Sequence, residues 1–471
     1  MTTSTGPVLF SATSPAGQLN SVLAVAAELS RRAVPDLWFA SYDDARSRIE
    51  SASTRSPVNF VSLDPAHPTG IEMGESDVVE RVQHSDPMST DGFMAIVNKH
   101  LSAPRIRVST YRNMLGVIDR LRPRLMVVDI LNASSMDAAM TRGIPFVMTV
   151  PGLPSYAFRL PLRYPSPVTG LPRRMNFSQH AANVWFKFRL GAALAPALGS
   201  PYVKACRSEG IKNPTANRYV YSDAAAMVLA PSVFGLEYEF ALPPRAHLIG
   251  AFLPSEPDAV RSDDHGLSRW LDDHTSVVYL GFGTIMRLSR AQIAALLAAV
   301  RRLAPHHAFL WKLPESQQGL LPAAPLPDNL RVESWLPSQT AVLAHPHVRA
   351  FVTHGGANGF HESVFHGKPM LVMPAWLDCH AVARRAVDSG VGLAVDRPDA
   401  VTGDEAAAKI TRILTEGSFR ERAEHWAERL REAGGVGRAA DLVLELAAGG
   451  PDVPVTPPDA ASRTPAPERP A

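Results

Sequence analysis

Cysteine is scarce in this chain of 471 residues, which holds only Cys206 and Cys379. Two cysteines cannot build a disulfide framework, and so few of them are typical of proteins from a reducing compartment. An excess of one charge is also missing, because 47 Lys and Arg stand against 45 Asp and Glu. This balance gives no electrostatic reason to expect a nucleic-acid partner. His, Cys and Asp residues do not cluster at the spacing of metal ligands, so we expect no bound metal.

Long apolar runs are absent as well. No stretch reaches the roughly 20 apolar residues that a membrane-spanning helix needs. Residues 1–17 lack the basic segment and following apolar segment that mark a secretory signal. We therefore expect a cytoplasmic protein, for which peripheral contact with a membrane surface stays open.

Short apolar runs alternate with helix-like segments, which predicts an α/β protein with parallel sheets. The N-terminal half begins with a strand, a small-residue turn, a helix and a second strand, at 8–10, 14–17, 19–32 and 37–40. Further strands are expected over 125–129 and 144–150. This order is typical of a Rossmann-like domain.

The alternation resumes in the C-terminal half. Strands are expected over 276–282, 307–312, 348–353, 370–373 and 392–395, with a helix over 291–303 and a helical segment over 404–447. A chain of this length favours two domains. Pro, Gly, Ser and Asp gather near 250–270, so we place an N-terminal domain over 1–250 and a C-terminal domain over 251–449. The Pro-rich residues 450–471 are expected to be disordered.

Residues 151–200 differ in character, because they are rich in Pro, aromatic residues and Arg. The aromatic residues Phe177, Trp185, Phe186 and Phe188 fall in a helix-like stretch. One interpretation is a mobile loop followed by a helix that faces the core. The other is a lid over a lipophilic ligand, or a basic and aromatic face that touches a membrane.

Three strand ends in the C-terminal half carry polar residues, at the place where parallel α/β sheets bind ligands. His354, Gly355 and Gly356 follow one strand and precede a helix, an arrangement that suits a diphosphate. Glu362 lies further along that helix and could accept hydrogen bonds from ribose hydroxyls. Asp378 follows the next strand and could contact a sugar. Taken singly, each feature could equally be a turn, a solvated glutamate or a helix cap.

Together these residues resemble the donor-binding box of the family 1 glycosyltransferases. The matching positions, in order, are Trp335, Pro337, His354, Gly356, Asn358, Glu362, Gly367, Pro369, Pro374 and Asp378. The resemblance implies the GT-B fold, in which two Rossmann-like domains face each other across a cleft. It also implies an inverting transfer that needs no metal, with a nucleotide sugar as co-substrate.

The resemblance implies a role for each matching residue. Trp335 would stack on the uracil, Glu362 would bind the ribose, and Asp378 would contact the transferred sugar. His354, Gly356 and Asn358 would hold the diphosphate. A further diphosphate contact is expected at Thr284, because 281–284 looks like the family's second phosphate loop.

The chain departs from the family pattern at three places in the box. One residue is inserted after Pro337, and this shift leaves open whether Gln339 reaches the base of the nucleotide. Gly359 replaces a serine, which removes a phosphate donor. Cys379 replaces a glutamine that helps to select the sugar, and cysteine is a poor hydrogen-bond donor.

The N-terminal half resembles the acceptor domain of the family more loosely. Gln18 occupies the place of the histidine base, whereas its aspartate partner is retained as Asp129. Neutral glutamine cannot accept a proton at physiological pH. Asp129 could act directly or through water, the acceptor could already be an anion, or the protein could be weakly active or inactive. Alternatively, a base could come from His84 or His100.

These features predict transfer of a hexose, glucose from UDP-glucose, to a small lipophilic acceptor such as a secondary metabolite or a lipid. A dTDP-deoxysugar is the alternative donor. A catalytically impaired protein that binds a nucleotide sugar is the alternative from another functional class, because of Gln18.

Overall fold

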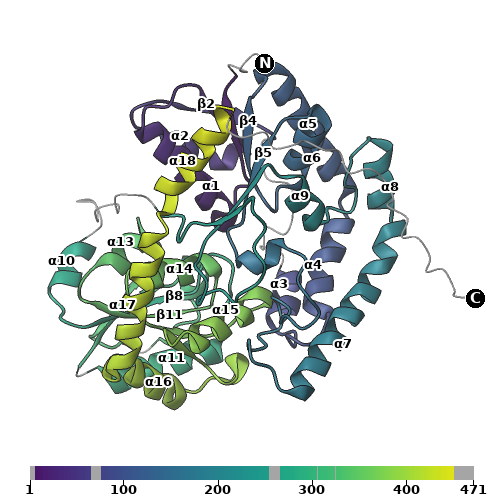
Figure 1. Cartoon of the computed structure of the whole chain (residues 1–471). Coiled ribbons are helices and arrows are strands. Elements are labelled where there is room, and N and C mark those ends of the chain that lie inside the picture. Colours follow the sequence, from purple (N-terminus) through teal and green to yellow (C-terminus); the bar gives the residue numbers. More distant parts are fainter. Residues whose placement is uncertain (1–5, 65–75, 254–265, 305, 324, 450–471) are drawn as a thin grey trace, which may run out of the picture.

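The computed structural model describes residues 6–64, 76–253, 266–304, 306–323 and 325–449. Within these residues the chain forms two parallel β-sheets surrounded by helices, as Figure 1 shows. The predicted α/β architecture with two Rossmann-like sheets is confirmed. The tail over 450–471 and much of the expected boundary region lie outside the described residues.

The N-terminal sheet has seven strands among the described residues, in the order β3-β2-β1-β4-β5-β6-β7. The strands are β1 (Val8–Ser11), β2 (Leu37–Ser41), β3 (Val58–Ser62), β4 (Leu125–Asp129), β5 (Phe146–Thr149), β6 (Met227–Ala230) and β7 (Ala246–Leu248). β1 pairs with β2 on one side and with β4 on the other. The strand order therefore reverses beside β1, and such a reversal opens a crevice at the carboxyl ends of the strands.

The C-terminal sheet has six described strands, in the order β10-β9-β8-β11-β12-β13. The strands are β8 (Val277–Gly281), β9 (Ala308–Lys312), β10 (Leu330–Glu333), β11 (Val348–Thr353), β12 (Met370–Val372) and β13 (Gly392–Ala394). Here the order reverses between β8 and β11, where Gly281 lies opposite Thr353. The loops that follow these two strands therefore begin side by side.

The helices and short 3₁₀ turns connect these strands. In the N-terminal half they are α1 (Ala16–Arg31), η1 (Asp43–Ala45), α2 (Arg46–Glu50), α3 (Ser76–Gln83), α4 (Asp91–Leu101), α5 (Pro104–Leu121), α6 (Ala133–Arg142), η2 (Pro154–Ala157), α7 (Phe177–Leu194), η3 (Ala195–Gly199), α8 (Pro201–Ser208) and α9 (Arg218–Ala224). In the C-terminal half they are α10 (Leu267–Asp272), α11 (Arg290–Leu303), α12 (Glu315–Gln318), α13 (Gln339–Ala344), α14 (Ala357–Phe365), α15 (Leu377–Asp388), η4 (Pro398–Ala400), α16 (Gly403–Thr415), α17 (Gly417–Glu432) and α18 (Gly435–Ala447).

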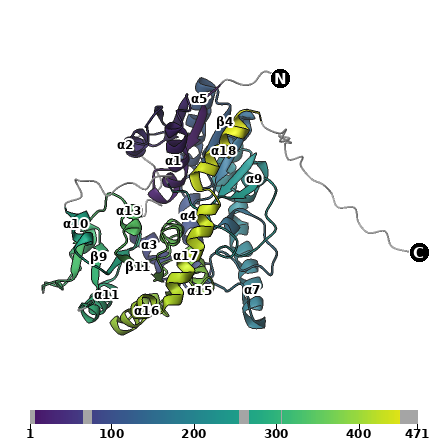
Figure 2. The ribbon, with the colours of Figure 1, turned by 60° about the vertical axis from the view of Figure 1, so that its left-hand side comes forward.

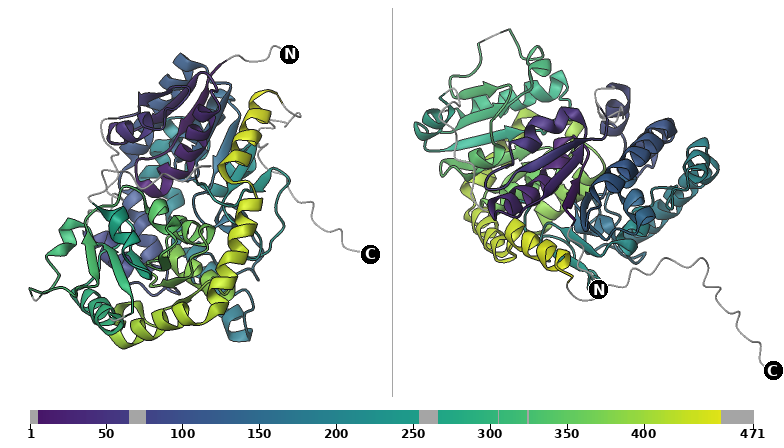
Figure 3. Two further views of the ribbon diagram at one scale, coloured as in Figure 1. Left: turned by 90° about the vertical axis from the view of Figure 1, so that its left-hand side faces the viewer. Right: turned by 90° about the horizontal axis from the view of Figure 1, so that it is seen from above.

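The last helix returns to the N-terminal sheet. α17 packs in the C-terminal half, the chain turns at Gly434 and Gly435 with positive φ, and α18 then lies beside α1 (Figures 2 and 3). Leu442 and Val443 of α18 belong to the same buried apolar cluster as Leu19 of α1. Although α18 falls within 251–449, its apolar face is therefore buried by the first domain.

Residues 151–200 form a loop with the turn η2, followed by the long helix α7. Of the four aromatic residues singled out there, only Phe186 is buried. Phe177, Trp185 and Phe188 are exposed. The interpretation of α7 as a helix that faces the core therefore holds for one side of it only.

Candidate functional site

A cleft of about 2300 Å³ lies between the two sheets and is lined by residues from both domains. The loops that follow β1 and β4 contribute to the N-terminal wall, and those that follow β8, β10, β11 and β12 contribute to the C-terminal wall. Both walls are thus built at the carboxyl ends of parallel strands. Nine of the predicted donor residues line the cleft: Thr284, Trp335, Gln339, His354, Gly356, Asn358, Gly359, Glu362 and Asp378.

The turn after β11 holds the imidazole of His354 between two glycines. A Cβ atom at Gly283 would lie 2.7 Å from His354 Cε1, and one at Gly356 would lie 2.6 Å from Nε2. Burial lowers the pKa of His354 to about 4, so the ring is neutral near pH 7. Its buried Nδ1 has no hydrogen-bond partner among the described residues. A polar atom of this kind on a cleft wall is suited to a ligand oxygen.

α14 begins directly after this turn, with Gly356 as its N-terminal cap residue. The free backbone N–H groups and the positive end of the helix dipole favour an anion at this place. The amide of Asn358, in the first turn, donates to the carbonyl oxygen of Gly17 at 3.1 Å. This hydrogen bond joins the donor box to the N-terminal domain across the cleft.

The C-terminal wall of the cleft also holds Trp335 and Glu362. Trp335 is 66% exposed and lines the cleft, so its ring can stack on a flat ligand. Gln339 donates through Nε2 to Glu362 at 2.5 Å and accepts from the Tyr279 hydroxyl at 3.0 Å. The inserted residue therefore leaves Gln339 on the cleft, where it orients the Glu362 carboxylate. Burial raises the pKa of that carboxyl.

Lys312 is a site residue that the sequence patterns did not single out. Its ammonium lies 4.7 Å from the centre of the Trp335 ring, a cation–π distance, and it lines the cleft. Lys312 is the last residue of β9, which pairs with β8. A search of every strand end in the sheet, and not only of those with Gly-rich turns, would have found it.

Asp378 and Cys379 begin α15 but have different surroundings. Asp378 lines the cleft, and burial raises its pKa to about 6. Cys379 is 1% exposed and is not among the residues that line the cleft. Its backbone packs against Gly355, where a Cβ atom would approach its carbonyl oxygen to 3.0 Å. This corrects the expectation that both residues face the donor, since the helix turns the thiol into the core.

The structure gives Gln18 and Asp129 different surroundings. Gln18 lines the cleft, and its buried Oε1 has no partner among the described residues. Asp129 is fully buried, is not part of the cleft lining, and accepts a hydrogen bond from the Leu131 amide at 2.9 Å. Burial raises its pKa to about 8, so the carboxyl is mainly protonated at pH 7. A buried acid in this form is a poor proton acceptor.

His84 and His100, the alternative candidates for the catalytic base, also differ in their surroundings. His84 lies 3.2 Å from the Asp399 carboxylate and is not among the residues that line the cleft. His100, at the end of α4, does line it, and burial lowers its pKa. A neutral imidazole can accept a proton at pH 7.

The N-terminal part of the cleft is largely apolar and aromatic. Its walls come from α4, α5, η2, α7, α8 and the loop before α9, and include Phe93, Ile96, Tyr156, Leu190, Leu194 and Tyr202. Such walls suit a lipophilic ligand.

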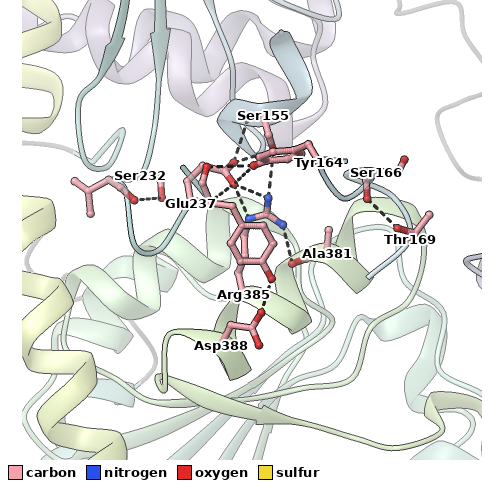
Figure 4. A network of polar contacts seen from close by, with 11 residues as sticks. Ser155, Tyr164, Ser166, Thr169, Ser232, Glu237, Ala381, Arg385 and Asp388 are labelled. Atoms are coloured by element: carbon pink, nitrogen blue, oxygen red, sulfur yellow. Dashed lines mark hydrogen bonds and ion pairs between the residues drawn. The ribbon is translucent and has the colours of Figure 1, made fainter. Parts of the chain in front are cut away.

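A buried ion pair connects the two domains beside the cleft, as Figure 4 shows. Arg385 of α15 donates to Glu237, which lies after β6, at 2.5 Å. Glu237 also accepts hydrogen bonds from Ser155 and from the Tyr164 hydroxyl, both in the loop before α7. α15 is therefore tied directly to the loop that borders the apolar half of the cleft. Sequence patterns could not pair two residues that are 148 positions apart.

Among the described residues, no group of three His, Cys, Asp or Glu side chains could hold a metal ion. None of the described helices is both long and apolar enough to cross a membrane.

Comparisons with known proteins agree with this geometry. UDP-glycosyltransferase 1 of Phaeomoniella chlamydospora is 26% identical over 328 residues, which cover 67% of this chain and 66% of that protein. The chain spans about half the length of the next two curated relatives.

Two solved structures share the fold. Os79 from O. sativa, in complex with U2F and trichothecene, has a TM-score of 0.67 and 18% identity over 94% of this chain and 99% of that one. The glycosyltransferase VinC, in complex with DTDP, has a TM-score of 0.63 and 18% identity over 94% of this chain and 100% of that one. A family model described as UDP-glucoronosyl and UDP-glucosyl transferase matches residues 126–427. These residues are more than half of the sequence and include the whole C-terminal wall of the cleft, and the chain belongs to this family.

Proposed function

We propose that the protein transfers a hexose, glucose from UDP-glucose, to a small lipophilic acceptor with inversion at the anomeric carbon. The observation that carries this proposal is the set of groups on one wall of the cleft. Trp335 is exposed on this wall, Gln339 holds the Glu362 carboxylate, and His354 lies in the turn that precedes α14. These groups suit the base, the ribose and the diphosphate of a nucleotide sugar. Asp378 would then hold the sugar beside the apolar half of the cleft.

The apolar half supports a lipophilic acceptor, because aromatic and aliphatic side chains of α4, η2 and α7 line it. The complex of the rice relative with trichothecene is in keeping with this class of acceptor.

The base for the acceptor hydroxyl is assigned to His100. It lines the cleft, whereas Gln18 is neutral and Asp129 is buried and protonated. General-base assistance contributes about 10²–10⁴-fold. A loss of this size in His100→Gln, but not in Asp129→Asn, would support the assignment. If neither variant loses turnover, the acceptor reacts as an anion and needs no base.

Gln18 offers a second test of the same question. Gln18→His places an imidazole where the family carries its base, so turnover on neutral alcohol acceptors is expected to rise. No gain on any such acceptor would mean that the cleft is arranged around another proton acceptor.

Donor choice is tested by calorimetric titration of the full chain with UDP-glucose and with dTDP-glucose, followed by transfer assays on a panel of acceptors. Tighter binding of UDP-glucose, with a glucosylated product, supports the proposal. Preference for dTDP-glucose supports the second candidate, a dTDP-deoxysugar donor. The structure of VinC in complex with DTDP is in keeping with that candidate. Tight binding without transfer or hydrolysis would contradict an enzymatic role.

A further inference from the structure

α7 exposes a continuous apolar stripe. Phe177, Val184, Trp185 and Phe188 are 90%, 43%, 59% and 66% exposed. Their spacing of 7, 8 and 11 residues from Phe177 places them on one side of the helix. Trp185 and Phe188 stack on each other with ring centres 5.7 Å apart. Soluble proteins rarely expose clustered large apolar side chains unless these bind something.

The stripe is held outward by the opposite side of the helix. Phe186 is buried, and Asn183 is fully buried, with its amide bonded to the backbone of Leu162, Tyr164 and Ser166. Lys187 donates to carbonyl oxygens of the same loop. A capping box at Asn176 fixes the start of the helix. Rotation of α7 to hide the stripe would break these contacts, so its exposure is a property of the fold.

The segment that carries the stripe is basic. Between Asp137 and Glu209 the sequence contains no Asp or Glu, whereas 151–200 contains Arg159, Arg163, Arg173, Arg174, Lys187 and Arg189. Arg159 is paired with Asp223, whereas Arg163, Arg173 and Arg174 are exposed in the loop before the helix. Leu162, in the loop before α7, and Leu198, in η3 after it, are exposed as well. Aromatic residues flanked by Arg are typical of helices that lie at a membrane surface.

We propose that the α7 stripe and its arginines dock on an anionic lipid surface. The aromatic side chains would enter the boundary between headgroups and acyl chains, and the arginines would contact the anionic headgroups. A second copy of the chain is a poorer occupant, because a symmetric contact would bring the same basic patch against itself.

Docking of this kind would place the cleft next to the lipid. Leu190 and Leu194, on another side of α7, line its apolar half. A lipophilic acceptor dissolved in the membrane could then pass along α7 into the cleft. This delivery step rests on the proposed function, whereas lipid binding itself does not.

Cosedimentation of the full chain with vesicles tests the proposal, using phosphatidylcholine alone and phosphatidylcholine mixed with phosphatidylserine. We expect binding to the mixed vesicles that weakens with salt. Arg173→Gln/Arg174→Gln should weaken it by about thirtyfold, since each basic side chain near an anionic surface contributes roughly fivefold. Phe177→Ser/Trp185→Ser/Phe188→Ser should abolish it. Arg420→Gln/Arg429→Gln, on exposed positions of α17, serves as the matched charge control and should bind normally.

Circular dichroism and binding of UDP show whether each variant is folded, and they report on the donor site independently of the lipid. Vesicles whose acyl chains carry bromine should quench the wild-type tryptophan fluorescence more than that of Trp185→Phe. Absence of vesicle binding, or equal binding to neutral vesicles, would overturn the proposal. So would a dimer in sedimentation velocity that the triple variant dissociates, because the stripe would then be an interface between copies. Vesicle binding without transfer to any acceptor would leave lipid docking supported and count against the proposed function.

Discussion

The Glu237–Arg385 pair offers the sharpest test of how the two domains are held together, because its members respond differently to loss of the partner. Arg385 is 2% exposed and Glu237 is fully buried. Without Arg385, Glu237 would keep hydrogen bonds from Ser155, Tyr164 and the Tyr238 amide. Without a carboxylate, Arg385 would keep the Ala381 carbonyl and a Ser155 contact at 3.3 Å.

The expected losses in the free energy of unfolding follow from the chemistry of the two groups. Removing one partner of a buried ion pair costs about 3–5 kcal/mol, because the other charge is left uncompensated. Glu237→Gln should reach this range, since a guanidinium cannot lose its proton at accessible pH. In Arg385→Met, Glu237 keeps its hydrogen bonds from Ser155, Tyr164 and the Tyr238 amide. The loss should then be about 1–3 kcal/mol, the usual cost of imperfectly satisfied buried polar groups.

Urea unfolding of wild type, both single variants and the double variant completes a mutant cycle. The double variant removes both charges, so it should be more stable than Glu237→Gln alone. Calorimetric titration with UDP-glucose should show weaker binding to Glu237→Gln, because α15 carries Asp378 in its first turn. If the two single losses simply add, or if Glu237→Gln costs less than about 1 kcal/mol, the pair does not couple the domains.

Three further predictions concern the donor wall. Trp335→Ala should weaken UDP binding by about 1–3 kcal/mol in calorimetry, the usual loss of a base-stacking partner, while Trp335→Phe retains most of the affinity. Gly356→Ala should weaken it as well, because the new Cβ atom would displace the His354 ring, whereas the control Gly116→Ala meets no atom within 4 Å. The KM for the donor should rise as the pH falls through about 6, because Asp378 is then protonated and loses its charge. This rise should be absent in Asp378→Asn, and its persistence there would assign the titration to another group.

The local sequence pattern was sufficient to predict most of the strands and helices that frame the site. The expected strand over 125–129 matches β4 at both ends, and that over 348–353 matches β11, because buried parallel strands are short apolar runs bounded by turns. The order of residues from Trp335 to Asp378 was likewise enough to place eight of the predicted donor residues on one cleft. Such spacing survives folding, since these residues lie just after β10, β11 and β12 or on the helices that follow these strands.

The burial of individual side chains and the contacts between residues far apart in the sequence could not be predicted in this way. Cys379 and Asp129 occupy positions that carry site residues in the family pattern, but both are buried and neither lines the cleft. Whether a side chain at a strand or helix end faces the ligand or the core depends on the layers packed behind it. Lys312 was not predicted, because a lysine at the end of a strand has no distinctive local pattern. The return of α18 to the first sheet depends on an apolar surface that α1 presents from the far end of the chain.

The α/β architecture, the two sheets and the donor wall with its family follow from the sequence alone. Periodicity and the spacing of Gly, His and Glu depend on near neighbours along the chain, and these can be recognised in a single sequence. Which residues meet across the cleft depends on the tertiary structure. It buries Asp129 but leaves Gln18 on the cleft, brings His100 to the cleft, joins Arg385 to Glu237 and turns the apolar stripe of α7 outward. Burial and electrostatic pairing are set by neighbours in space, and for Arg385 and Glu237 these neighbours are 148 residues apart in the chain.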